Sequence, residues 1–391
     1  MVDSLGRVPT EEMRRACRDL LDSHWREPGF CVPNADVYPW QWLWDSCFHA
    51  LVWAELGASD RAVTELTNAL AFQDLETGFV PHLVYWADPS FHESFWGRRM
   101  TSCISQPPMF GHAVAELVHA GVEVPTDLID RAAAGLAFLL RNRRRSAAGL
   151  VEVAHPWESG ADDSPRWDGL IPAPYDLSAW RRRKGELVAS ITASPSGAPL
   201  FNDDCAVGSV GFSSLVAFNA LELCTIRPDE QLVQEALELA EAIGRRWDVD
   251  FRTWVDDGPT TTSSGRIRSL DAMLATLVDP DPARVDVALD QLVDHDAFGG
   301  AFGPAGVHRH EATFDPVVYW RGPAWPQLSY LCWVAAGRAS RPDVAATLSR
   351  SLIAGATNSS WAEYWNPDTG EGGGAIPQTW TTVALLVAPD D

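Results

Sequence analysis

Carboxylates placed among tryptophans are the most chemically suggestive feature of this sequence. Residues 38–46 (YPWQWLWDS) bring three tryptophans and Asp45 to the start of an apolar helical pattern. Indole faces stack on sugar rings, and a carboxylate accepts hydrogen bonds from sugar hydroxyls. The helix dipole alone also favours an acid in a first turn. Because capping requires no neighbouring tryptophans, we interpret this block as part of a sugar site.

A second block, residues 155–168 (HPWESGADDSPRWD), contains four acids, two tryptophans, two prolines and a glycine. An aspartic acid in an apolar pocket beside other acids has a raised pKa and can act as a general acid. The Asp-Asp-Ser-Pro run is also typical of an exposed turn. The flanking Trp157 and Trp167 argue against full exposure.

A third block, residues 361–374 (WAEYWNPDTGEGGG), places Glu363 among aromatic residues ahead of a turn. Glycoside hydrolysis needs two carboxyl groups, one that protonates the leaving oxygen and one that activates water or attacks carbon. A lone glutamate is most often solvated, but beside the other blocks Glu363 fits the second carboxyl group. Residues 319–326 (YWRGPAWP), 78–82 (GFVPH) and 105–108 (SQPP) give further signals.

The blocks YPWQWLWDS, SQPP, ESGADDSPRWD, YWRGPAW and AEYWNPDTGEG resemble glycoside hydrolase family 63, in family order and from about residue 30 onward. Within it they are similar to the short bacterial mannosylglycerate and glucosylglycerate hydrolase-like branch, although single blocks also resemble trehalases and glucoamylases. The resemblance implies an (α/α)6 barrel, an α-linked substrate and inversion at the anomeric carbon.

By position, the resemblance implies that Asp162 is the general acid and Glu363 the general base. The sugar-holding positions of the family match Tyr38, Trp44, Asp45, Gln106, Trp320, Trp325 and Gln378. To these we add His82 from residues 78–82, Trp157 from residues 155–168 and Tyr319 from residues 319–326. The family commonly has Met-Asp-Asn where this chain has Ala161-Asp162-Asp163, so either aspartate could be the proton donor.

Helical periodicity fills most of the chain, with apolar segments alternating with amphipathic ones. This alternation of inner and outer helices predicts an all-α (α/α)6 barrel, with an α-solenoid as the alternative. The expected helices lie near 9–25, 43–57, 59–74, 106–121, 124–143, 206–224, 229–247, 266–277, 280–294, 321–337, 340–356 and 377–388. The long loops 26–42, 75–105, 144–205, 248–265, 295–320 and 357–377 should gather at one end. We expect one catalytic domain, 1–391, with 144–205 inserted as a lid.

Composition narrows the possible partners. The 391 residues carry a net charge of −23, so nucleic acid and anionic membranes are unfavourable partners. The seven scattered cysteines indicate reduced thiols, and the N-terminus shows no secretory signal, so a cytoplasmic location is expected. Lys184 is the only lysine, which we interpret as the composition bias of a GC-rich bacterial genome.

The sequence therefore predicts an inverting α-glycosidase for a small α-glucoside or α-mannoside, either glycerate-linked or a short α-gluco-oligosaccharide. We expect a small carbohydrate as the partner and no metal or organic cofactor, since His308 and His310 lack a convincing ligand set. The oligomeric state is left open. A trehalase- or glucoamylase-like glucosidase, a non-catalytic sugar-binding protein, a sugar epimerase or lyase, and a helical scaffold are the alternatives.

Overall fold

Six helices that are buried on nearly every side form a closed inner ring. The computed structural model describes residues 10–258 and 266–389. Four inner helices are α-helical: α2 (Leu43–Glu55), α5 (Phe110–His119), α8 (Val210–Cys224) and α11 (Pro326–Arg338). The 3-10 helices η4 (Asp271–Leu277) and η5 (Thr379–Leu385) complete the ring. Neighbours pack in the order α2, α5, α8, η4, α11, η5 and back to α2.

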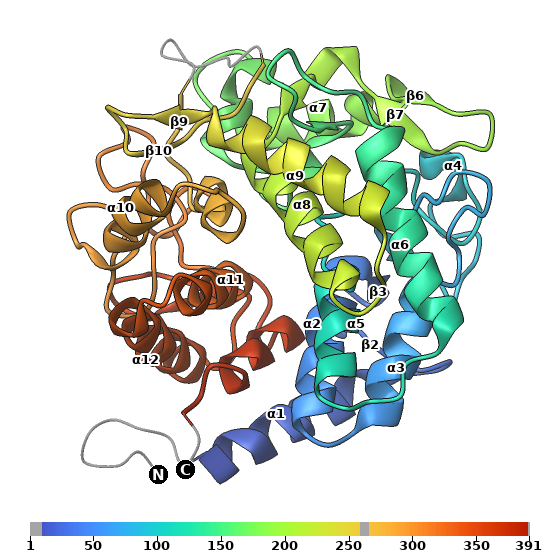
Figure 1. Ribbon diagram of the computed structural model, residues 1–391, viewed down its shortest axis with the longest axis horizontal. Helices are drawn as coiled ribbons and strands as arrows, with labels where there is room; N and C mark the ends of the chain where they lie inside the picture. The colour runs from blue at the N-terminus through green and yellow to red at the C-terminus, as the bar shows by residue number, and fades with distance from the viewer. Residues whose placement is uncertain (1–9, 259–265, 390–391) are drawn as a thin grey trace.

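The outer layer places one helix against each inner helix. It consists of α3 (Ser59–Ala69), α6 (Thr126–Arg141), α9 (Glu230–Gly244), α10 (Pro282–Val293), α12 (Pro342–Asn358) and α1 (Thr10–His24). Pairs such as α8 with α9 and α11 with α12 lie side by side (Figure 1). The first helix, α1, packs on the last, η5. The predicted (α/α)6 barrel is thus confirmed, and ring closure excludes an open solenoid.

Two expected α-helices, 266–277 and 377–388, are instead the short 3-10 helices η4 and η5. Threonine hydroxyls near them bond main-chain carbonyls: Thr276 to Met273, Thr381 to Ala362 and Thr382 to Thr379. Such bonds compete with regular α-helical geometry.

The helical pattern in the sequence did not predict α4 (Glu93–Trp96) and α7 (Leu177–Ala189), which lie inside expected loops. A run of four basic residues weakens the apolar pattern of α7. Asp176 nevertheless caps this helix, because its Oδ1 accepts from the Ala179 amide over 2.6 Å.

The long loops each connect an outer helix to the next inner helix, so they meet at the N-terminal end of the inner ring. They contain 3-10 turns η1 (Pro156–Ser159), η2 (Pro165–Leu170) and η3 (Asp203–Cys205). Their two-stranded antiparallel sheets pair β1 (Trp25–Arg26) with β2 (Phe30–Cys31), β3 (Gln41–Trp42) with β4 (Leu83–Val84), β5 (Glu152–Val153) with β8 (Val207–Gly208), β6 (Thr192–Ala193) with β7 (Pro199–Phe201), β9 (Trp247–Asp248) with β10 (Thr253–Trp254), and β11 (Tyr364–Trp365) with β12 (Gly372–Gly373).

The longest insertion carries α7, β6 and β7, which lie together at one edge of the molecule (Figure 1). Residues 259–265 of the expected 248–265 loop lie outside the described residues, as do residues 1–9, to which the expectation of no secretory signal refers. Within the described ranges, no helix has the length and apolar character needed to cross a bilayer.

Candidate active site

Glu363, directly before β11, is held by three hydrogen bonds. Its Oε1 accepts from the hydroxyls of Tyr38, over 3.1 Å, and Tyr319, over 3.2 Å, and its Oε2 accepts from the Ala375 amide over 2.9 Å. Burial raises the pKa of Glu363, these donors lower it and the charge of Asp162 raises it, so that the pKa lies above its usual value. A carboxylate with a raised pKa and a fixed orientation is suited to act as a base.

The backbone next to Glu363 leaves no room for a side chain. Gly374 has φ +71°, and a Cβ atom there would overlap Glu363 Oε2. A glycine is therefore required at this position if the carboxylate is to keep its place.

Asp162 lies in the turn between η1 and η2, ahead of α7 in the sequence. Its charge raises the pKa of Glu363, Tyr38 and Tyr319, so the Asp162 carboxyl lies within electrostatic reach of all three. Gly160 brings this turn against the barrel: a Cβ atom there would lie 2.7 Å from the Trp44 ring. The two predicted catalytic carboxyl groups thus lie within electrostatic reach of each other.

Lys184 is a site residue that the sequence analysis did not identify. Its ammonium donates to Asp162 Oδ2 over 2.6 Å and to Asp163 Oδ1. Burial and the neighbouring Asp162 charge raise the pKa of Asp163 to about 6. The interpretation of the lysine-poor composition as genome bias did not predict this position for Lys184. Its occurrence as the sole lysine was the only signal in the sequence.

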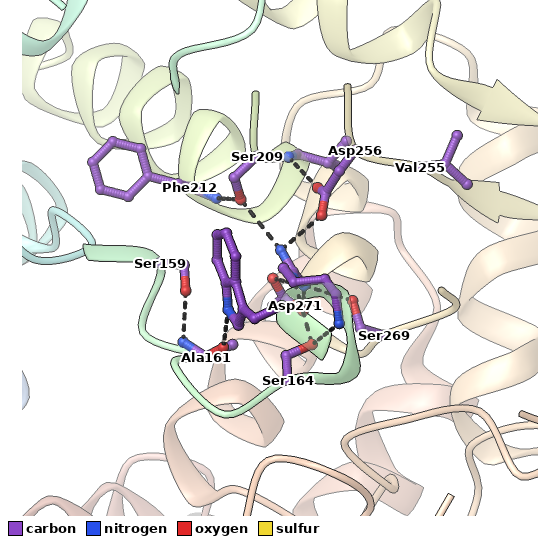
Figure 2. A network of polar contacts seen from close by, with 12 residues as sticks. Ser159, Ala161, Ser164, Ser209, Phe212, Val255, Asp256, Ser269 and Asp271 are labelled. Carbon is purple, nitrogen blue, oxygen red and sulfur yellow. Dashed lines mark hydrogen bonds and ion pairs between the residues drawn. The ribbon is translucent and has the colours of Figure 1, made fainter. Parts of the chain in front are cut away.

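A buried arginine anchors the turn that carries Asp162. Arg166 pairs with Asp271, at 2.6 Å from its Oδ2, and with Asp256, at 2.9 Å. Its guanidinium also donates to Ser164, Ser209 and Ser269. Figure 2 shows these five partner side chains close together. Ser164 comes from the turn, Ser209 directly precedes α8, Asp256 follows β10, and Ser269 and Asp271 lie just before and at the start of η4. This network fixes η2 to the barrel.

Asp45, in the first turn of α2, is only 3% exposed. Burial raises its pKa to about 7. Its Oδ1 accepts from Gln378 Nε2 over 3.5 Å, and the neighbouring Trp44 amide donates to Gln106 Oε1 over 3.0 Å. A buried carboxylate with so few protein donors can accept hydrogen bonds from a ligand.

Three predicted tryptophans, Trp44, Trp320 and Trp325, form one connected group with Trp380, which we call the aromatic wall. Trp320 stacks face to face on Trp325, with ring centroids 3.7 Å apart, and Trp380 contacts both Trp325 and Trp44 at 6.0 Å. Trp320 has φ +59°, a left-handed conformation that is strained for a bulky residue.

Five buried polar atoms in this wall and in the nearby blocks lack a hydrogen-bond partner among the described residues. They are the indole nitrogens of Trp42, Trp44, Trp320 and Trp325 and the Oε1 of Gln378. These five atoms are closed off from solvent, and buried polar atoms are rarely left unpaired.

His82 and Trp157 lie one layer further out. Burial lowers the pKa of His82 to about 3, and its ring contacts Trp42 and Trp96 edge-on. The hydrogen bond of the His82 ring goes to the Ser102 hydroxyl and not to a catalytic carboxyl group. Trp157 packs on Trp96, and its ring lies 5.7 Å from Lys184 Nζ. Both residues contact Trp96, in an aromatic cluster separate from that of Trp44, Trp320 and Trp325.

Comparison with known proteins assigns the family. A family model described as the mannosylglycerate hydrolase MGH1-like glycoside hydrolase domain matches residues 38–381. The chain belongs to this family. The resemblance to glycoside hydrolase family 63 and its mannosylglycerate and glucosylglycerate hydrolase branch is thus confirmed.

Two curated relatives cover almost the whole chain. The mannosylglycerate hydrolase of Rubrobacter radiotolerans is 28% identical and covers 96% of both chains. The glucosylglycerate hydrolase of Mycolicibacterium hassiacum is also 28% identical and covers 90% of this chain and 92% of its own. The protein is therefore a glycoside hydrolase, an inverting α-glycosidase that acts on small α-glycosides.

A solved structure shows the same fold. The family 63 mannosylglycerate hydrolase of Thermus thermophilus, crystallised with Tris and D-glycerate, superposes with a TM-score of 0.79. It is 23% identical and covers 96% of this chain and 99% of its own, which supports the barrel architecture.

Proposed function

We propose that Asp162 is the general acid and Glu363 the general base of a single-displacement hydrolysis. The observation that carries this proposal is the arrangement around Glu363: Tyr38 and Tyr319 hold one of its oxygens, and the charge of Asp162 acts on all three groups. Two carboxyl groups from different loops that face one region are what an inverting glycosidase requires.

In the proposed reaction, the proton of Asp162 moves to the glycosidic oxygen as the bond from that oxygen to the anomeric carbon breaks. A water molecule attacks the anomeric carbon from the opposite face, and Glu363 takes the proton that this water loses. Asp162 ends ionised and Glu363 protonated, and exchange with solvent restores both. The product carries the inverted anomeric configuration.

The glycone is proposed to bind against the aromatic wall. Asp45 accepts hydroxyl hydrogen bonds there. The complete proposed binding set is Tyr38, Trp44, Asp45, Gln106, Tyr319, Trp320, Trp325 and Gln378, with His82 and Trp157 in support.

Two substrate types remain candidates. An α-glucoside or α-mannoside of glycerate is supported by the names of the relatives. A neutral short α-gluco-oligosaccharide is supported by the charges near the acid: Lys184 is engaged by Asp162 and Asp163, and Arg321 by Asp168. An anionic aglycone would have to compete with these carboxylates for a cation.

The insertion 144–205 is proposed to act as a lid within the single catalytic domain, because it supplies Asp162, Asp163 and Lys184. A cytoplasmic location is proposed from the seven cysteines, which are all free thiols.

A hydrolysis screen tests the proposed function. Glucosylglycerate, mannosylglycerate, trehalose, kojibiose, nigerose and isomaltose are incubated with the wild-type protein and with Glu363→Gln, and the product anomer is followed by NMR. We expect one substrate class to release the β-anomer first, and Glu363→Gln to lose this activity. Undiminished hydrolysis by Glu363→Gln would contradict the proposed base.

A further inference from the structure

The ammonium of Lys184 lies between two neighbouring carboxylates at the candidate acid. Side-chain exposure is 6% for Lys184, 16% for Asp162 and 5% for Asp163, so all three groups are largely removed from water. One positive charge cannot neutralise two buried carboxylates. A proton must therefore bind to one of the two if the cluster is to be neutral.

The hydrogen-bond donors decide which aspartate stays ionised. Asp163 accepts from Lys184, from Trp180 Nε1 over 2.9 Å and from the Tyr175 hydroxyl over 3.4 Å. Among the described residues, the Asp162 carboxyl accepts from Lys184. Burial and the charge of an ionised Asp162 raise the pKa of Asp163 to about 6. When Asp162 holds the proton, the second of these causes disappears, and the three donors to Asp163 then favour its carboxylate form. The donors therefore place the anion on Asp163 and the proton on Asp162.

We propose that Lys184 is a positioning residue that neutralises Asp163 and so leaves Asp162 as the carboxyl group holding the transferable proton. The inference rests on the proposed role of Asp162 as general acid. Lys184 is also in place to stabilise the Asp162 carboxylate that forms when the proton leaves. With Asp163 and Lys184 carrying opposite charges, the pair beside the acid has no net charge.

His155 and Arg321, two titratable groups near the cluster, do not replace Lys184 as the cation beside Asp162 and Asp163. Burial lowers the pKa of His155 to about 4, so its ring, which contacts the Lys184 carbonyl over 2.9 Å, is neutral near pH 7. Arg321 lies 3.6 Å above the Tyr175 ring and pairs with Asp168.

The remaining titratable neighbours lie across the site. Glu363, Tyr38 and Tyr319 sense the charge of Asp162, and burial holds the pKa of each tyrosine above its usual value. The tyrosines are therefore neutral at working pH. Lys184 remains the cation that contacts both aspartates.

Helix α7 places Trp180 and Lys184 against the Asp162–Asp163 turn. Trp180 and Lys184 are four residues apart, which places both side chains on one face of the helix. That face meets the Asp162–Asp163 turn, and the ammonium lies 5.6 Å from the Trp180 ring and 5.7 Å from the Trp157 ring.

The test is a charge cycle read from the alkaline limb of the pH profile of kcat/KM, which reports the essential acid of the free enzyme. In Asp163→Asn the ammonium contacts Asp162 alone and favours the ionised form of Asp162. The pKa of the alkaline limb should therefore move to lower pH, by about one pH unit or more. Lys184→Met leaves two adjacent carboxylates without a cation, so the pKa of the alkaline limb should move to higher pH by a similar amount. Asp163→Asn/Lys184→Met restores a neutral environment and should return the limb toward the wild-type position.

A purely structural role for Lys184 would reduce kcat or thermal stability without these opposite shifts, and that result would overturn the inference. If Lys184→Met fails to fold, the fall in Asp163→Asn and its reversal in the double variant still decide the question. Failure of the proposed function is seen separately, because Asp162→Asn would then show no dependence on the leaving group.

Discussion

The Tyr38 hydroxyl donates to Oε1 of Glu363 over 3.1 Å, although the two residues are 325 positions apart in the chain. One residue precedes the first inner helix and the other precedes the last 3-10 helix. Closure of the ring between α2 and η5 therefore brings the proposed base and its hydrogen-bond donor together.

Tyr38→Phe should move the acidic limb of the pH profile to higher pH. The hydroxyl stabilises ionised Glu363 and lowers its pKa, so its loss raises that pKa and the base is protonated at a higher pH. We expect a shift of less than about one pH unit, and a similar one for Tyr319→Phe, from kcat/KM measured across pH. Tyr330→Phe, which removes a buried hydroxyl bonded to His112, is the control. A limb that is unmoved or lower would contradict the assignment.

Asp45→Asn distinguishes a glycone ligand from a helix-dipole acid. A ligand role predicts a loss of about 10–100-fold in kcat/KM, since hydrogen bonds to charged groups contribute about 1.5–3 kcal/mol. Asp60→Asn changes the matching first-turn acid of α3, which is exposed, and should leave kinetics unchanged. If both variants lose only thermal stability, Asp45 serves the helix and not the substrate.

Arg166→Met should destabilise the fold by about 3–5 kcal/mol, because it leaves the Asp256 and Asp271 carboxylates without their buried partner. Urea unfolding monitored by tryptophan fluorescence gives this free energy. Arg131→Met breaks a pair with Asp127, which is 77% exposed, and should change stability by less than about 1 kcal/mol. Equal effects of the two variants would show that the buried network does not anchor η2.

Local patterns in the sequence were enough to predict the alternating helical layers, and the aromatic blocks located Asp45, Asp162 and Glu363. Lys184 could not be found this way, because its two aspartate partners lie more than 20 positions away in the chain. The basic residues of α7 also mask its helical apolar pattern. Trp53 in α2 is fully buried, whereas Trp247 in β9 is only partly buried.

The most direct test of the central claim compares two substrates with the same glycone in the variant Asp162→Asn. One is an unactivated alkyl or sugar α-glycoside, and the other is the α-glycosyl fluoride, whose leaving group needs little protonation. Loss of the general acid should lower kcat on the first about 10²–10⁴-fold, while the fluoride stays within about tenfold of the wild type. Glu363→Gln should lose both activities. An equal loss on both substrates in Asp162→Asn, or no loss on either, would contradict the account.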